Sequence, residues 1–154
     1  MRAALHLLAL ALLLLAAAAP ARGEAPPPPA ADRAEAEAWS VVLEVPAPLR
    51  PGAPAVASLR LTARAGNHVN LDYPASFRPA ADATVAFAGA RVALSPADRV
   101  ACAGHAEETC TVRWPLPFTA ADTARARVAG TLAFSVCSAE RCLIERVVLG
   151  AGPR

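Results

Sequence analysis

The sequence predicts an all-β protein, and more narrowly an immunoglobulin-like antiparallel β-sandwich. Between Trp39 and Gly150 the chain carries seven or eight short runs of β-branched, aromatic and aliphatic residues, separated by turns of Gly, Pro, Asn and Asp. No long amphipathic helical pattern follows residue 38. The span of about 110 residues suits one such sandwich, which needs roughly 100. We therefore expect one core and one domain over residues 39–150.

The N-terminus has the pattern of a secretory signal peptide. Met1 and Arg2 give a positive start, an apolar run follows over residues 5–19, and small residues with Pro20 come next. The run of about 15 residues is short for a membrane-spanning helix, which needs roughly 20, and an uncleaved anchor is the alternative. We expect residues 1–23 to be removed, with the cut between 21 and 25, and the mature protein to be periplasmic.

The charge of the chain bears on its partners. Its 154 residues include 15 basic residues, all of them Arg, and 13 acidic residues. Removal of residues 1–23 takes away Arg2 and Arg22, which leaves 13 basic residues against 13 acidic ones. A nearly neutral protein lacks the clustered basic excess that nucleic acids and anionic membranes attract. We therefore expect no nucleic-acid partner, and we expect a monomer.

Residues 24–38 are rich in Pro and then in Ala and Glu, which favours an extended, disordered linker with a frayed helical turn after the prolines. Beyond this linker, apolar alternation predicts strands at 39–45, 55–65, 68–74, 85–87, 92–94, 111–118, 131–136 and 143–149. We expect irregular chain at 77–79 and a loop at 95–98. Pro115 and Pro117 predict a sheet edge or an irregular crossing.

The last two strands form a predicted β-hairpin with a four-residue loop. Cys137 and Cys142 stand on either side of that loop. Facing residues in a hairpin have β-carbons about 4.5–5.5 Å apart, which is slightly more than a disulfide usually spans. A modest local twist would bring the two sulfurs together. The sequence therefore predicts a small, solvent-facing, cross-strand disulfide.

An exported chain with four cysteines most simply forms two disulfides. Four cysteines allow three connectivities. The one that joins Cys102 to Cys110 and Cys137 to Cys142 has the shortest separations in the sequence. Spacing alone leaves open whether either disulfide is catalytic or structural. Cys102, His105 and Cys110 also offer three metal ligands, but their spacing matches no common zinc pattern, and we expect no metal.

Conventional catalytic motifs are missing from the sequence. Ser, His and Asp occur, but no Gly-x-Ser-x-Gly elbow or phosphate-cradling glycine loop places them. His68 at a strand end suits a structural histidine better than a general base. His105 has two interpretations, a solvated loop residue or a group that tunes a nearby thiol. We expect no cofactor.

Two stretches resemble a known family. Gly66-Asn-His-Val-Asn70 with Tyr73-Pro74, and Phe-Ser-Val-Cys137-x4-Cys142-Leu-Ile-Glu, are similar to the N-terminal periplasmic domain of the thiol:disulfide interchange protein DsbD and its stand-alone relatives. The similarity covers roughly residues 39–150, and the cysteine hairpin is its most specific part. The sequence departs from the family pattern in two places. Residues 95–110, the counterpart of the loop that covers the disulfide, carry no aromatic shield. After Cys142 this chain has Leu-Ile-Glu, where the best-studied members have prolines.

The resemblance implies an immunoglobulin-like sandwich whose terminal hairpin carries a redox-active cysteine pair, Cys137 and Cys142. It implies a component of protein-disulfide reduction, with electrons passing from a thioredoxin-like domain of a membrane donor to periplasmic disulfide oxidoreductases. Because the chain stops at Arg154, we expect that donor to be a separate polypeptide. We take Cys137 as the attacking sulfur and the 102–110 disulfide as structural.

A second hypothesis stays open from the residues alone. In it both disulfides are redox-inert, and the protein is a stapled β-sandwich with a binding or structural role. The reduction potential of the 137–142 pair separates the two hypotheses, because structural disulfides usually lie below about −300 mV.

Overall fold

The computed structural model describes residues 30–81 and 83–154, and the regular secondary structure of these residues consists of β-strands. They are β1 Arg33–Glu35, β2 Trp39–Glu44, β3 Pro54–Ala63, β4 His68–Val69, β5 Ser76–Pro79, β6 Val92–Ala93, β7 Asp98–Cys102, β8 His105–Thr119, β9 Val128–Cys137 and β10 Cys142–Ala151. The predicted signal peptide, residues 1–23, lies outside the described residues. Within them, no helix has the length and apolar character needed to cross a membrane.

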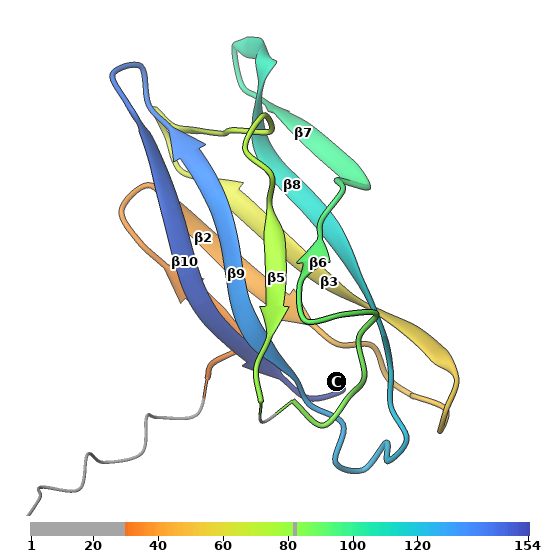
Figure 1. Cartoon of the computed structure of the whole chain (residues 1–154). Coiled ribbons are helices and arrows are strands. Elements are labelled where there is room, and N and C mark those ends of the chain that lie inside the picture. The colour runs from red at the N-terminus through yellow and green to blue at the C-terminus, as the bar shows by residue number, and fades with distance from the viewer. Residues whose placement is uncertain (1–29, 82) are drawn as a thin grey trace, which may run out of the picture.

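The strands form an open antiparallel sheet that folds over into a two-layered β-sandwich, so the all-β prediction is confirmed (Figure 1). One layer holds β1, β2, β3, β8 and β7, and the other holds β10, β9, β5 and β6. The two-residue strand β4 pairs with both β8 and β9 and so joins the layers. The narrower assignment to an immunoglobulin-like sandwich stays a prediction.

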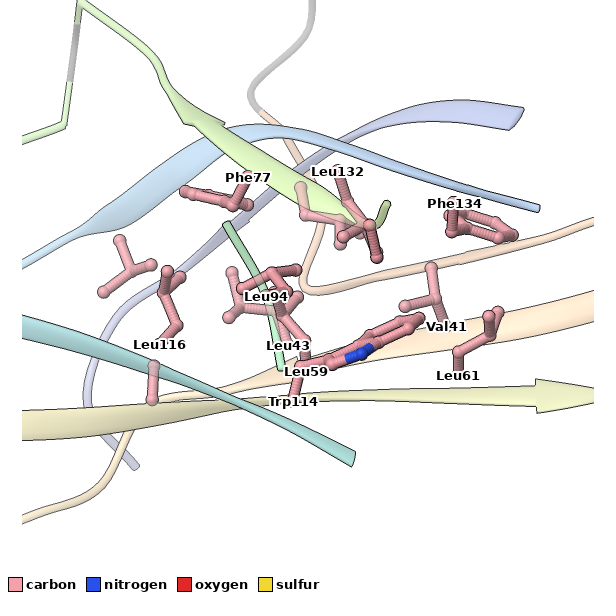
Figure 2. Packing of buried hydrophobic residues seen from close by; sticks show 14 of the residues in the cluster. Val41, Leu43, Leu59, Leu61, Phe77, Leu94, Trp114, Leu116, Leu132 and Phe134 are labelled. Carbon is pink, nitrogen blue, oxygen red and sulfur yellow. The ribbon is translucent and has the colours of Figure 1, made fainter. Parts of the chain in front are cut away.

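The core lies between the layers and follows from the alternation seen in the sequence. In β2 every second residue, Trp39, Val41 and Leu43, is buried. Phe134 of β9 meets Trp39 across the layers, with ring centroids 5.0 Å apart in an edge-to-face arrangement. Figure 2 shows the side chains of both layers filling the same interior, with Leu59 and Trp114 from one layer and Leu132 from the other. The two layers are therefore held by one continuous apolar core.

The domain begins earlier than the sequence predicted. Residues 24–38 were expected to form a linker, but Arg33–Glu35 form β1, which pairs antiparallel with β2. Ala34 packs against the core, and the backbone N–H of Gly150 donates to the carbonyl of Ala31 at 2.9 Å. Tertiary pairing therefore overrides the helical and linker preference of an Ala- and Glu-rich segment. Residues 24–29 lie outside the described part.

Three local predictions differ from the structure. Residues 77–79 were expected to be irregular, but they belong to β5, which pairs with β9 along its whole length. Residues 85–87 were expected to be a strand, and they contribute only the single bridge from Ala86 to Thr119. Residues 68–74 were expected to form a strand, but only His68–Val69 do so, as β4.

The segment around the first cysteine pair, for which no element was predicted, forms a second hairpin, β7 with β8, which turns at Gly104 with a positive φ of 79°.

The prolines of β8 lie where the sheet is locally open. Pro115 and Pro117 pair with β3 on one side. On the other side the pairing of β8 with β7 stops at Arg113 and Asp98, so both prolines lie beyond the paired region. The prediction of an edge position therefore holds for the part of β8 that contains the two prolines, whereas residues 111–113 of β8 have a strand on each side.

Candidate functional site

The predicted hairpin disulfide is present at the tip of β9 and β10. Cys137 and Cys142 are direct cross-strand partners and are joined by a disulfide. The strands run on from them in unbroken register to the pair Val128–Ala151. This regular two-stranded ladder presents the disulfide at one end of the sandwich (Figure 1).

The loop between the two cysteines is organised by Ser138. Its backbone N–H donates to the carbonyl of Arg141 at 2.8 Å. Its hydroxyl accepts from the backbone N–H groups of Glu140 and Arg141 at 3.2 and 3.3 Å and donates to the Glu140 carboxylate at 2.7 Å. The loop therefore keeps its shape through its own hydrogen bonds, in addition to the disulfide.

The two cysteines of this hairpin differ in exposure. Cys137 is only 4% exposed, whereas Cys142 is exposed. The cause lies in the neighbouring strands, because Cys137 has Cys142 on one side and His68 of β4 as its partner on the other. Cys142 lies beyond it, on a strand end with no further strand pairing in the described residues. A protein thiol approaching from solvent therefore meets Cys142 first, and this exposure favours Cys142 over the predicted Cys137 as the reacting sulfur.

The second predicted disulfide, Cys102–Cys110, is also present, near the tip of the β7–β8 hairpin. Cys102 is 9% exposed and Cys110 is half-buried. The two sulfurs lie 3.9 and 3.7 Å from the backbone carbonyl oxygen of Asn67. A disulfide sulfur carries no hydrogen, so these are packing contacts and not hydrogen bonds. This disulfide is thus covered by the β3–β4 connection.

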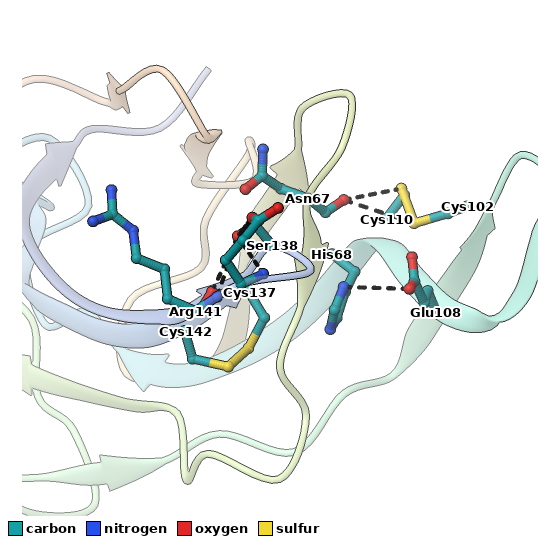
Figure 3. A network of polar contacts seen from close by, with 10 residues as sticks. Asn67, His68, Cys102, Glu108, Cys110, Cys137, Ser138, Arg141 and Cys142 are labelled. Atoms are coloured by element: carbon teal, nitrogen blue, oxygen red, sulfur yellow. Dashed lines mark hydrogen bonds and ion pairs between the residues drawn. A yellow bond between two sulfur atoms is a disulfide. The ribbon is translucent and has the colours of Figure 1, made fainter.

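Both disulfides border the same short segment, Asn67 and His68. Figure 3 shows this segment between the two sulfur pairs, with the backbone carbonyl oxygen of Asn67 directed to Cys102 and Cys110. A hollow of about 470 Å³ has both of these cysteines and Ala139 of the other hairpin loop in its lining. The two hairpin tips therefore flank one surface depression.

His68 and His105 both lie at this end of the molecule. His68 Nδ1 is 3.7 Å from the carboxylate of Glu108, and both side chains are partly exposed. His105 is exposed at the start of β8 and lines the same hollow. Across residues 30–81 and 83–154, no group of three or more His, Cys, Asp and Glu side chains is placed to hold a metal ion.

The sequence identified the four cysteines and their pairing, and the disulfides bear this out. It did not identify the contact of Asn67 with the second disulfide or the burial of Cys137 by β4. Both depend on which strands become neighbours across the fold, and no local pattern encodes that. Comparisons with protein-family models, with curated proteins and with solved structures found no match.

Proposed function

We propose that this protein is an exported, periplasmic thiol–disulfide exchange module that carries electrons through Cys137 and Cys142. The observation that supports this most directly is the unequal exposure of a bonded pair at a hairpin tip. Exchange needs one sulfur that an incoming thiolate can reach and a second sulfur close by that leaves and later resolves the mixed disulfide. Exposed Cys142 suits the first role and buried Cys137 the second.

The electron-accepting reaction follows from these roles. A thiolate of a thioredoxin-like donor attacks Sγ of Cys142, an intermolecular S–S bond forms, and the Cys137–Cys142 bond breaks with Cys137 leaving as a thiolate. The second thiolate of the donor then attacks the donor's own sulfur and releases Cys142 as a thiolate. The donor ends as a disulfide and this protein as a dithiol, so two electrons have moved.

The electron-donating reaction is the reverse. The Cys142 thiolate attacks the disulfide of a periplasmic oxidoreductase, and Cys137 then attacks Sγ of Cys142 to release the reduced acceptor. The partners that this chemistry requires are a separate dithiol donor and a disulfide acceptor.

A redox-inert, disulfide-stapled binding or structural sandwich is the second candidate. The observation in its favour is that a disulfide closes both hairpins at this end, and that the β9–β10 loop is already ordered by Ser138. By this account Cys137 is buried because it is a packing element. The two candidates differ in whether the hairpin disulfide reacts.

The test uses a single-cysteine thioredoxin, activated as a mixed disulfide with thionitrobenzoate, whose release is read by absorbance. Cys137→Ser leaves Cys142 as a lone thiol, and Cys142→Ser leaves Cys137. We expect the Cys137→Ser variant to form the protein adduct at least about tenfold faster, because its remaining thiol is exposed. The double variant Cys137→Ser with Cys142→Ser is the control and should form none.

Two other outcomes have clear meanings. If neither variant forms an adduct and the 137–142 pair has a reduction potential below about −300 mV, the stapled sandwich replaces the exchange module. If the order of the rates is reversed, exchange stands but Cys137 is the reacting sulfur, as the sequence suggested.

A further inference from the structure

Three arginines from separate segments converge on the outer face of the β10–β9–β5 layer. Arg78 lies on β5, Arg91 immediately before β6, and Arg146 on β10. Together they line a hollow of about 320 Å³. In Figure 1 the strands β10, β9 and β5 lie side by side, which is the arrangement that brings these positions together.

The strand register explains why these side chains share a face. Ser76, Ala133 and Arg146 are successive cross-strand partners on β5, β9 and β10. The next row on the same face holds Arg78 and its partner Thr131. The residues between these rows point into the core, where Phe77 and Leu132 are fully buried. The hollow is therefore set on the opposite side of the layer from the core.

The chemistry of the lining is one-sided. The lining holds three guanidinium groups, three hydroxyl groups and one alanine. Its residues are Tyr73, Ser76, Arg78, Arg91, Thr131, Ala133 and Arg146. No carboxylate is among them. Guanidinium groups offer only donors, and hydroxyl groups can donate as well. The hollow therefore presents a donor-rich, positively charged surface.

The six polar side chains of the lining have no side-chain partner in the part of the chain that the structure describes. Among residues 30–81 and 83–154, no side-chain hydrogen bond or ion pair engages any of the six. Ser76 is mostly buried, with 7% of the residue exposed, and it still lines the hollow.

Two acidic residues that adjoin lining residues in the sequence, Asp72 and Glu145, line other hollows. Asp72 precedes Tyr73 but lines another hollow with Glu107 and Glu108. Glu145 precedes Arg146, and by strand alternation it faces the other side of β10, where it lines a hollow beside Trp39. Among the described residues that line the hollow, no carboxylate therefore neutralises the three arginines.

We infer that this hollow is a binding site for a compact oxyanion carrying two or more negative charges, such as a phosphate, a sulfate or a tricarboxylate. Guanidinium forks form paired, charge-assisted hydrogen bonds with such groups, and the hydroxyls of Ser76, Thr131 and Tyr73 supply neutral donors. Arg146 lies four residues from Cys142 on the same face of β10, about 13 Å along the strand. The site is distinct from the disulfide and does not depend on thiol exchange.

The test is isothermal titration calorimetry of the intact protein with inorganic phosphate, sulfate and citrate, against sodium chloride at the same ionic strength. We expect at least one of the three anions to bind with a Kd below about 1 mM, and chloride to give no saturating heat. Arg146→Gln and Arg91→Gln should each weaken that binding at least about tenfold, because each removes a charge-assisted contact. Ser76→Ala should weaken it while leaving the net charge unchanged.

Arg99→Gln is the matched control, because Arg99 is exposed on β7 and outside the hollow. It makes the same charge change and should leave the affinity within about twofold of the parent. The arginines of the site are exposed, so circular dichroism should show that every variant is folded. The inference is overturned if no anion binds more tightly than chloride, or if Arg99→Gln weakens binding as much as Arg146→Gln does.

Discussion

The two disulfide-bearing hairpins lie at the same end of the sandwich but are built differently. The β9–β10 hairpin has β4 and β5 beside it, and its inner face carries Phe134 into the core. The tip of the β7–β8 hairpin is mostly exposed, and its disulfide is covered by the carbonyl of Asn67. In the first hairpin a well-anchored ladder ends in an exposed cysteine, and in the second a loosely anchored tip holds a covered disulfide. Anchoring of the backbone and access to the sulfur are thus separate properties.

The first prediction measures the difference in anchoring and has the largest expected effect. Phe134→Ala on β9 should lower the free energy of unfolding by about 3–5 kcal/mol, because it empties a fully buried site beside Trp39. Val100→Ala on β7 should change it by less than about 0.5 kcal/mol, because Val100 is 59% exposed. Urea denaturation followed by tryptophan fluorescence measures both. Equal effects would show that the two hairpins are anchored alike.

The second prediction concerns the two disulfides as cross-links. Their sequence separations are 8 and 5 residues, so the loops they close are similar in size. The chain-entropy model then assigns each about 2–3 kcal/mol of stabilisation. Replacing Cys102 and Cys110 together by Ser should therefore cost about as much as replacing Cys137 and Cys142 together. A loss more than about 2 kcal/mol larger for one pair would mean that covering contacts, and not loop closure, dominate its contribution.

The third prediction separates the disulfides by reactivity. Thioredoxin should open the 137–142 disulfide at least about tenfold faster than the 102–110 disulfide, because attack requires an accessible sulfur. Quenched alkylation and tryptic mass mapping give both rates from one reaction. Trypsin leaves Cys102 and Cys110 together in the peptide 100–113, and cleavage after Arg141 places Cys137 and Cys142 in two other peptides. Equal rates would remove the distinction on which the proposed function depends.

The smallest effect is expected in the loop that joins Cys137 to Cys142. Ser138→Ala removes the hydroxyl that accepts from two backbone N–H groups, and it should cost about 1 kcal/mol. Ala139→Ser is the control, because Ala139 is an exposed neighbour in the same loop. Thermal unfolding measures both changes. A neutral result for Ser138→Ala would mean that the disulfide alone keeps the loop in shape.

The sequence predicted the parts of the fold that depend on local pattern. Apolar alternation located β2, β3 and the β9–β10 hairpin, and the cysteines at the hairpin ends gave the correct partner pair. The strand β5 was missed because it is four residues long and ends in a proline, so its only strong signal is its pairing with β9. The strand β1 was missed because Ala and Glu favour helices, and its conformation comes from pairing with β2.

The chemistry of the site was predicted less completely for the same reason. The identity of the cysteine pairs follows from spacing and hairpin geometry, but the exposure of each sulfur depends on β4, which comes from a segment about 70 residues earlier in the chain. The three arginines of the outer face are separated in the sequence. The register of β5, β9 and β10 brings Arg78 and Arg146 together, and the pairing of β6 with β5 adds Arg91. Side chains that gather across strands leave no local motif.

The two ends of the described chain lie together at the opposite end of the sandwich from the cysteines. Ala31 is hydrogen-bonded to Gly150, and Arg154 forms an ion pair with Asp32 at 2.7 Å. The nine residues of β10 from Cys142 to Gly150 extend over roughly 26 Å. A bead, dye or sensor surface attached through the C-terminal residue Arg154 would therefore leave the disulfide-bearing end facing the solution (Figure 1). Tethered molecules would present both disulfides in one common orientation, which suits surface-binding measurements on single molecules.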